Sequence, residues 1–217
     1  MHVMKNTYLN LIFILTFLFI TSLSHSQVTK TEIKKLDSTK VKHVNIGFKV
    51  GIPNLIGGSA EIILPALGNR IGPYIDYSGF NIDTDEVGTN LSYLEYGANL
   101  YFNPKGSGFF ISLGQAKFDS DLTFYDLIFT NGDMSSTGTI STDFNFNTTN
   151  LKLGIKTSGT FYFRFEVGFG FGDIPDSIDF TATVDGITES FSEEIPPIPG
   201  LGQSGILIGN IGFGVAF

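Results

Sequence analysis

FYFRFEVGFGFG, residues 161–172, is the stretch that decides the fold of this chain. Its odd-numbered residues are all Phe or Val, whereas its even-numbered residues include Arg164, Glu166 and three glycines. Because side chains alternate between the two faces of a β-strand, this pattern predicts a strand with one apolar and one polar face. A tilted strand crosses a bilayer in roughly nine to eleven residues, so the stretch has the length of a transmembrane β-strand.

The same alternation recurs along the chain, with an apolar face opposite a face of polar residues and glycines. It predicts eight strands, over residues 44–52, 58–64, 70–80, 91–102, 109–114, 149–155, 161–172 and 205–217. Single-chain bacterial barrels have an even number of antiparallel strands, from eight upward. We therefore predict an all-β fold, an eight-stranded antiparallel up-and-down transmembrane β-barrel formed by residues 43–217.

The connections between these segments alternate in length. Those at 65–69, 103–107 and 156–159 are short, and those at 80–90, 119–147 and 173–204 are long. Outer-membrane barrels have short periplasmic turns and long extracellular loops, so this alternation predicts that both termini lie in the periplasm. It also predicts long extracellular loops at 119–147 and 173–204. The connection at 53–57 departs from the pattern, because it is short although it lies at the end of the barrel where the other connections are long.

Two of the long connections contain residue pairs that favour a tight hairpin turn, Asn131-Gly132 and Asp185-Gly186. We expect both to form hairpins that rise above the membrane. The alternative is that the second hairpin joins the barrel wall, which would give ten strands.

The C-terminal segment ends in IGFGVAF, residues 211–217, with apolar residues at alternate positions and a final Phe. This ending resembles the assembly signal of outer-membrane β-barrels, and the chain resembles small, Bacteroidota-like barrels of the Omp-like β-barrel superfamily. The resemblance implies an assembly signal at Phe213, Val215 and Phe217. It also implies a porin-like protein located in the cell outer membrane of a Gram-negative bacterium. Its expected partners are the barrel-assembly machinery and outer-membrane lipids.

The N-terminal residues have the pattern of an export signal. Lys5 precedes a mostly apolar run at 9–20, and small residues, Ser24 and Ser26, follow it. This predicts a signal peptide at 1–26, cleaved before Gln27, because the apolar run is too short for a membrane-spanning helix. Residues 27–42 are rich in lysine and are predicted to be a periplasmic N-terminal tail.

Composition excludes several classes of function. The chain has no cysteine, which excludes disulfides and thiolate metal sites, and its net charge of −8 argues against nucleic acid as a partner. The predicted extracellular segments contain many Asp and Glu residues and no Lys or Arg between residues 118 and 151. Divalent cations could bind there, since Ca²⁺ takes several oxygen ligands. The alternative is that these residues only keep the surface soluble.

The sequence contains little that could support catalysis. After residue 26 the only histidine is His43, which comes just before the first strand at the predicted periplasmic end. Nucleophilic catalysis needs a base beside the nucleophile, and no second candidate base is evident. We therefore expect no enzyme activity, no catalytic or metal site and no cofactor.

The inward-facing positions, in contrast, hold several charged residues. They are Lys49, Glu61, Asp76, Glu95, Lys152, Arg164 and Glu166. Folding the hairpins about their turns predicts three neighbouring pairs: Lys49 with Glu61, Asp76 with Glu95, and Lys152 with Arg164. An eight-stranded barrel is just wide enough for side chains to fill, so the like-charged pairs should meet across the lumen as a charge network.

These patterns predict a non-enzymatic outer-membrane barrel with a polar-plugged lumen and a structural or surface-interaction role. The sequence does not identify an extracellular partner. One alternative is a narrow channel or a small-ligand-binding barrel. A further alternative is a secreted soluble β-sandwich or lipocalin-like carrier, although its apolar band would favour aggregation in water.

Overall fold

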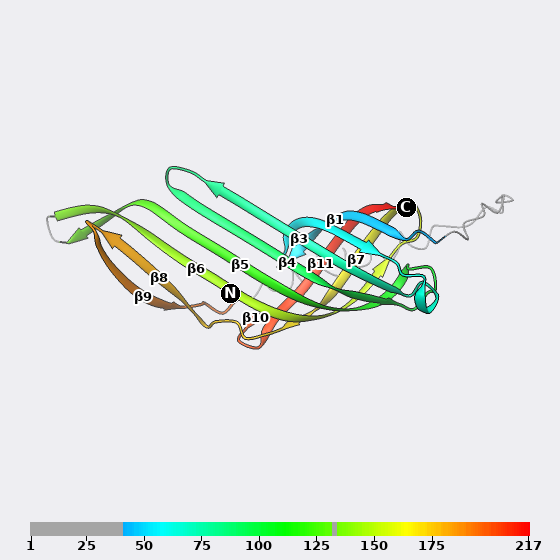
Figure 1. The fold of residues 1–217 in the computed structure, drawn as a ribbon. Helices are drawn as coiled ribbons and strands as arrows, with labels where there is room; N and C mark the ends of the chain where they lie inside the picture. The colour runs from blue at the N-terminus through cyan, green and yellow to red at the C-terminus, as the bar shows by residue number, and fades with distance from the viewer. Residues whose placement is uncertain (1–40, 132–133) are drawn as a thin grey trace, which may run out of the picture. The chain divides into compact units, whose positions relative to one another are not determined.

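The computed structural model describes residues 41–131 and 134–217, which form antiparallel β-strands joined by short connections (Figure 1). The predicted signal peptide and nearly all of the predicted tail lie outside the described residues. Within those residues, no helix is long and apolar enough to cross a membrane. The elements are β1 (Val44–Ile52), β2 (Leu55–Ile62), the short 3-10 helix η1 (Ala66–Gly68), β3 (Ile71–Asp83), β4 (Val87–Tyr101), β5 (Gly108–Asn131), β6 (Met134–Lys156), β7 (Phe161–Phe171), β8 (Ser177–Val184), β9 (Ile187–Glu194), β10 (Leu201–Gly202) and β11 (Gly205–Ala216).

Eight of these strands pair in a closed ring. Strands β1 to β6 each pair with the next strand along the chain, and β11 pairs with both β7 and β1. The β1–β11 seam extends from Asn45 opposite Ala216 to Ile52 opposite Gly209. The predicted all-β, antiparallel, up-and-down barrel is therefore confirmed, and its closure pairs the strand edges within the ring.

The hairpin of β8 and β9 lies outside this ring. Strand β8 pairs with β6 at residues 138–142, whereas residues 149–156 of β6 pair directly with β7. The ten-strand alternative is therefore wrong. Asp185 and Gly186 form the turn of this hairpin, and their φ angles of 50° and 79° are those that a type I′ turn requires.

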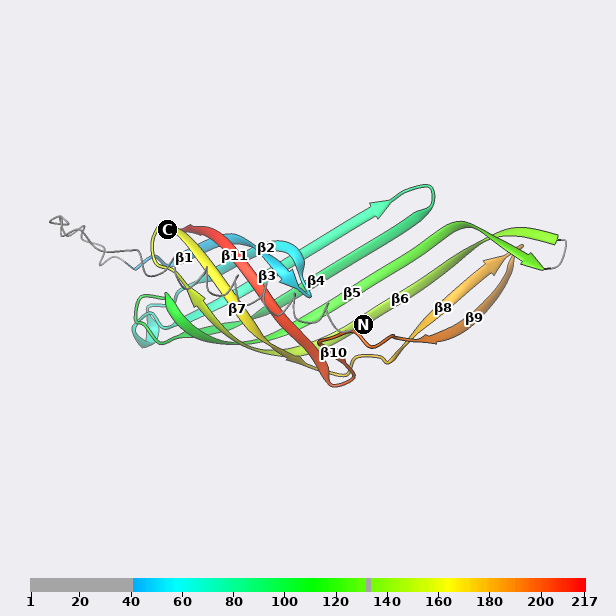
Figure 2. The same ribbon diagram turned by 180° about the vertical axis from the view of Figure 1, so that it is seen from behind.

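The strands on one side of the barrel continue far beyond its rim. Figure 2 shows β3 to β6, with β8 and β9 beside them, extending past the shorter strands β1, β2, β7 and β11. Most of the stretch predicted as a long loop, 119–147, is thus a continuation of β5 and β6. We call the part of the sheet beyond Tyr77 on β3, Leu94 on β4, Ala116 on β5 and Thr148 on β6, together with β8 and β9, the extension.

The sequence predicts hairpins about Asn131-Gly132 and Asp185-Gly186, but not that β5 and β6 run unbroken from the barrel into the first of them, because the polarity of these strands is inverted beyond the rim. On β6 within the barrel, Leu151 and Leu153 face outward and are exposed, whereas Lys152 and Asn150 face inward and are buried. In the extension, Phe146 lies on the inner face and Asn147 and Asn145 lie on the outer face. A search for strands with an apolar outer face therefore stops at the barrel rim.

An apolar outer surface surrounds the barrel itself. Phe163, Phe165 and Val167 of β7 are 38–45 % exposed, whereas Arg164 and Glu166 between them are 1 % exposed. The predicted outward orientation of this face is found. Phe169 lies on the same face but is half-buried, because it packs against Phe171. The barrel thus has the polarity of a membrane protein, with an apolar exterior and a polar interior.

We predict that Phe165→Arg will lower the free energy of unfolding in lipid vesicles by about 2–4 kcal/mol, because it places a charge on this surface near the middle of β7. Urea titration of vesicle-embedded protein measures the change. Thr123→Arg, on the outer polar face of the extension, is the control and should change stability little. Equal losses in the two variants would contradict a lipid-facing position for Phe165.

Candidate functional site in the barrel lumen

Charged side chains from six strands fill the barrel interior. They come from the inward-facing positions of β1, β2, β3, β4, β6 and β7, and all are between 0 % and 3 % exposed. Glycines on the same inner face leave room for them and for the aromatic rings; a Cβ at Gly154 would collide with the ring of Phe110. The residues are Lys49, Glu61, Asp76, Glu95, Lys152, Lys156, Arg164 and Glu166. We call this set the lumen network.

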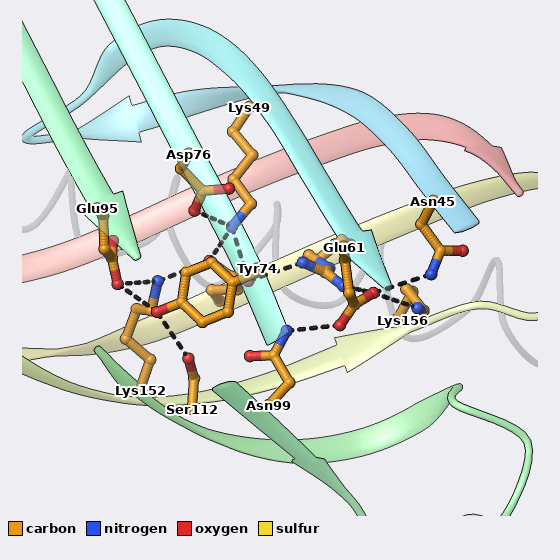
Figure 3. A network of polar contacts seen from close by, with 12 residues as sticks. Asn45, Lys49, Glu61, Tyr74, Asp76, Glu95, Asn99, Ser112, Lys152 and Lys156 are labelled. Carbon is orange, nitrogen blue, oxygen red and sulfur yellow. Dashed lines mark hydrogen bonds and ion pairs between the residues drawn. The ribbon is translucent and has the colours of Figure 1, made fainter. Parts of the chain in front are cut away.

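Glu61 is the centre of one half of the network (Figure 3). Its Oε2 atom lies 2.6 Å from both Arg164 Nη2 and Lys156 Nζ. Its Oε1 atom accepts hydrogen bonds from Asn99 Nδ2, at 2.6 Å, and from the Tyr101 hydroxyl, at 2.7 Å. A single carboxylate on β2 thereby binds groups on β4, β6 and β7.

Glu166 joins the two halves. It lies 3.0 Å from Lys49 Nζ and 3.4 Å from Lys152 Nζ through its Oε2 atom, and its Oε1 atom is 3.6 Å from Arg164 Nη1. Lys49 also reaches Asp76 Oδ2 at 2.6 Å. Lys49 on β1 therefore bridges a carboxylate on β3 and another on β7.

The other half of the network is centred on Glu95. Its Oε1 atom lies 2.7 Å from Lys152 Nζ and accepts a hydrogen bond from the Tyr74 hydroxyl, while Oε2 accepts one from Tyr93 at 2.7 Å. Tyr74 also presents its ring to Lys152, whose Nζ lies 4.9 Å from the ring centroid. This arrangement gives the buried ammonium both a carboxylate and an aromatic partner.

The lumen network is electrically balanced, with four cationic side chains facing four carboxylates. Transfer of an unpaired charge into such an interior is costly, so each group needs its opposite. Every one of the eight has an ion-pair partner within 3.6 Å. The ion pairs thus form one connected network across the interior.

The structure places all seven charged residues named from the sequence in the interior, but it corrects two of the predicted pairs. Lys49 lies opposite Gly57 rather than near Glu61, because the first hairpin turns at Pro53–Asn54, nearer to β1 than predicted. Lys152 lies opposite Gly168 rather than beside Arg164. The predicted neighbours Asp76 and Glu95 are register partners.

Sequence reasoning missed Lys156, which is the register partner of Arg164. The sequence predicts that Lys156 lies in the connection at 156–159, whereas β6 ends at Lys156 itself. The signal was present in the sequence, because Lys156 has the same spacing from Gly154 as Gly154 has from Lys152. Extending the alternation by one residue pair would have placed it inward.

The remaining candidate groups lie apart from the network. His43 Nδ1 donates to the Ile63 carbonyl at 2.7 Å, before β1 begins. On the outer face of the extension Asp143 is the register partner of Asp121, and their hydrogen bond raises the pKa of the Asp143 carboxyl. Among the described residues no group of three or more His, Cys, Asp or Glu side chains is arranged to hold a metal ion.

Comparison with known proteins identifies similar solved structures at low sequence identity. No family model matches the chain, and no curated protein matches it in sequence. The crystal structure of Acinetobacter baumannii CarO has a TM-score of 0.45 and 13 % identity, covering 81 % of this chain and 98 % of that one.

Two further structures are similar. Acinetobacter baumannii CarO2 has a TM-score of 0.44 and 12 % identity, and a major outer membrane protein from Thermus thermophilus has a TM-score of 0.44 and 9 % identity. Each match covers 82 % of this chain and 100 % of the other. Any function of this chain therefore has to follow from its own residues.

We predict that Glu61→Gln will lower the free energy of unfolding by about 3–5 kcal/mol, because it leaves Lys156 buried without a carboxylate and Arg164 with only its 3.6 Å pair to Glu166. The variant keeps the side-chain volume, so the loss reports the charge. Asp119→Asn is the control, because it breaks an exposed pair with Lys117 whose contribution should be below about 1 kcal/mol. Similar small losses in both variants would contradict a tightly paired network.

Proposed function

We propose that this chain is a non-enzymatic outer-membrane β-barrel, closed by the lumen network, that holds the extension outside the cell for surface interaction. The observation that carries the proposal is the burial of eight mutually paired charges inside an apolar-faced ring. A soluble barrel or carrier would have the opposite polarity, with an apolar interior and a polar exterior.

The exterior of the barrel supports insertion into a membrane. Phe48, Ile75, Leu113 and Phe213, on four different strands, are each between 45 % and 59 % exposed. In water, a belt of this kind would favour aggregation, whereas in lipid it matches its surroundings. A closed ring also satisfies the backbone hydrogen bonds of its strands, which the bilayer core requires.

The lengths of the connections support the orientation. The start of β1, the end of β11 and the short turns after β2, β4 and β6 lie at one end of the barrel, and the extension continues from the other. Outer-membrane barrels have their short turns on the periplasmic side. This favours a periplasmic position for residues 41–43 and an extracellular position for the extension.

Closure of the lumen follows from the cost of opening it. A solute passing through would have to separate carboxylates from their cations, and breaking one buried pair costs about 3–5 kcal/mol. The network spans β1 to β4 and β6 to β7, so several pairs would have to part together. The proposal is therefore a barrel that anchors the extension and does not conduct.

We predict that the purified protein will show no large, stable conductance in planar lipid bilayers. The double variant Glu95→Ala with Lys152→Ala removes one carboxylate and one ammonium, so the lumen stays electrically neutral. It leaves empty space between the strands, and the variant should therefore conduct ions. Lys117→Ala with Asp119→Ala removes an exposed pair and should remain silent. Large steady conductance from the unmodified protein would instead support the narrow-channel alternative.

We also predict that deleting Phe217 will reduce the amount of barrel in the outer membrane. The Phe217 amide donates to the Val44 carbonyl at 2.8 Å, at the seam that closes the ring, and this residue ends the proposed assembly signal. Phe161→Ala, which removes an exposed phenylalanine at the same end, is the control. Quantitative blotting of membrane fractions measures the effect; normal levels after the deletion would argue against the assembly signal.

A further inference from the structure

The inner face of the extension is an apolar surface that the closed lumen does not use. Register pairing shows that it continues the inner wall of the barrel, since Tyr93, which donates a hydrogen bond to Glu95 of the lumen network, lies opposite Phe118, which lies opposite Phe146. Phe118 and Phe146 stack, with ring centroids 4.9 Å apart. The same face then continues along the strands toward the hairpin tips.

Residues on this face are almost all apolar or hydroxyl-bearing. One register row crosses six strands through Ile82, Thr89, Leu122, Thr142, Phe180 and Phe191. The next row contains Val87, Phe124, Ile140, Ala182 and Glu189. Glu189 of β9, at the edge of the sheet, is the only charged residue in these two rows.

Only the part of this face nearest the barrel is covered. There Ile174 and Ile206 pack with Phe146 in a buried cluster, and Phe144 and Leu201 lie against it. Farther out, Phe80, Ile82 and Phe191 are 42–46 % exposed. Contiguous apolar surface exposed to water marks a contact site for another molecule.

We propose that the inner face of the extension is the surface through which two copies of this chain associate side by side in the membrane. The inference rests on the proposed function, which places the extension outside the cell. Both chains are then held in one membrane with their extensions on the same side. A twofold axis along the membrane normal would oppose the two inner faces in a self-complementary contact.

Charge favours the inner faces over the outer faces as the contact between two copies. The outer face of the extension contains Asp119, Asp121 and Asp143, and the whole chain has a net charge of −8. Two copies that meet through their inner faces turn these acidic surfaces away from each other. Contact through the outer faces would instead oppose like charges, which lowers affinity.

The size of the surface also fits a dimer. The two rows above, together with the row of Phe80, Leu91, Ser120 and Phe144, hold 15 residues. Strands lie about 4.8 Å apart and successive residues on one face lie roughly 6.6 Å apart, so these residues cover on the order of 500 Å². Two such faces bury on the order of 1,000 Å² in total, which reaches the lower bound for a specific interface. Facing sheets of this kind pack about 10 Å apart.

The experiment uses the full chain, purified in detergent and reconstituted into lipid nanodiscs, with its mass measured by light scattering. The unmodified protein should be a dimer. Leu122→Lys with Phe180→Lys should be monomeric, because it places opposing charges in the inner-face contact. Thr123→Lys with Thr181→Lys changes the adjacent residues on the outer face and should remain dimeric.

Crosslinking gives an independent measurement, because the chain contains no native cysteine. Leu122→Cys should form a crosslinked dimer with a short bis-maleimide, and Thr123→Cys should not. Heat-modifiable migration on gels shows that each variant has folded. A monomeric unmodified protein, or a dimer that survives the lysines at 122 and 180, would overturn the inference, and so would a monomer carrying bound lipid on this face.

The two proposals fail in different ways. A monomer that is silent in planar bilayers would overturn the dimer and leave the closed barrel in place. A conducting protein would overturn the closed barrel, whatever its oligomeric state.

Discussion

The pairing of every charge inside the barrel is the constraint on which the rest of the structure depends. The interior of an eight-stranded barrel leaves little room for water, so a charge there has to find its counter-ion among the side chains of other strands. Glu61 meets this need with groups from β4, β6 and β7, and Lys49 meets it with groups from β3 and β7. The contacts join strands that are not neighbours in the ring, so they fix its cross-section as well as its charge balance.

The same strands change polarity where they leave the barrel. On β6 the outward residues pass from Leu151 to Asn147 and Asn145, while the inward residues pass from Lys152 to Phe146 and Phe144. A lipid exterior needs an apolar outer face, and the buried lumen tolerates polar groups only when they are paired. In the proposed orientation both requirements end beyond the rim, and there the outer face is polar and the inner face apolar.

The sequence predicted the faces of the strands better than it predicted their ends and registers. Alternation alone placed Lys49, Glu61 and Arg164 inward, because the period of two is a local property of each strand. Pairing also depends on where each hairpin turns, and the β1–β2 turn lies nearer to β1 than the sequence suggested, which separates Lys49 from Glu61. The sequence predicts a long connection with a hairpin at 119–147, rather than a continuation of both strands, because the apolar outer face that is typical of a membrane-spanning strand ends at the barrel rim.

Stability alone does not account for a polar lumen, since well-packed apolar side chains of the same volume can be as stabilising as a buried ion network. A polar lumen is better explained by its effect on the register in which neighbouring strands pair. A slip of one residue in any barrel strand exchanges its inner and outer faces. For β7 such a slip would move Arg164 and Glu166 to the surface that carries Phe163 and Phe165. It would break the ion pairs that Glu166 forms with Lys49 and Lys152 and the one that Arg164 forms with Glu61. A slipped barrel would then hold two charges on its apolar outer face, and phenylalanine rings would replace two members of the ion network in its lumen. The apolar outer face is rich in Phe, Ile, Leu and Val at every outward position, so it distinguishes one register from another only weakly. The lumen network therefore supplies register information in each strand that contributes to it.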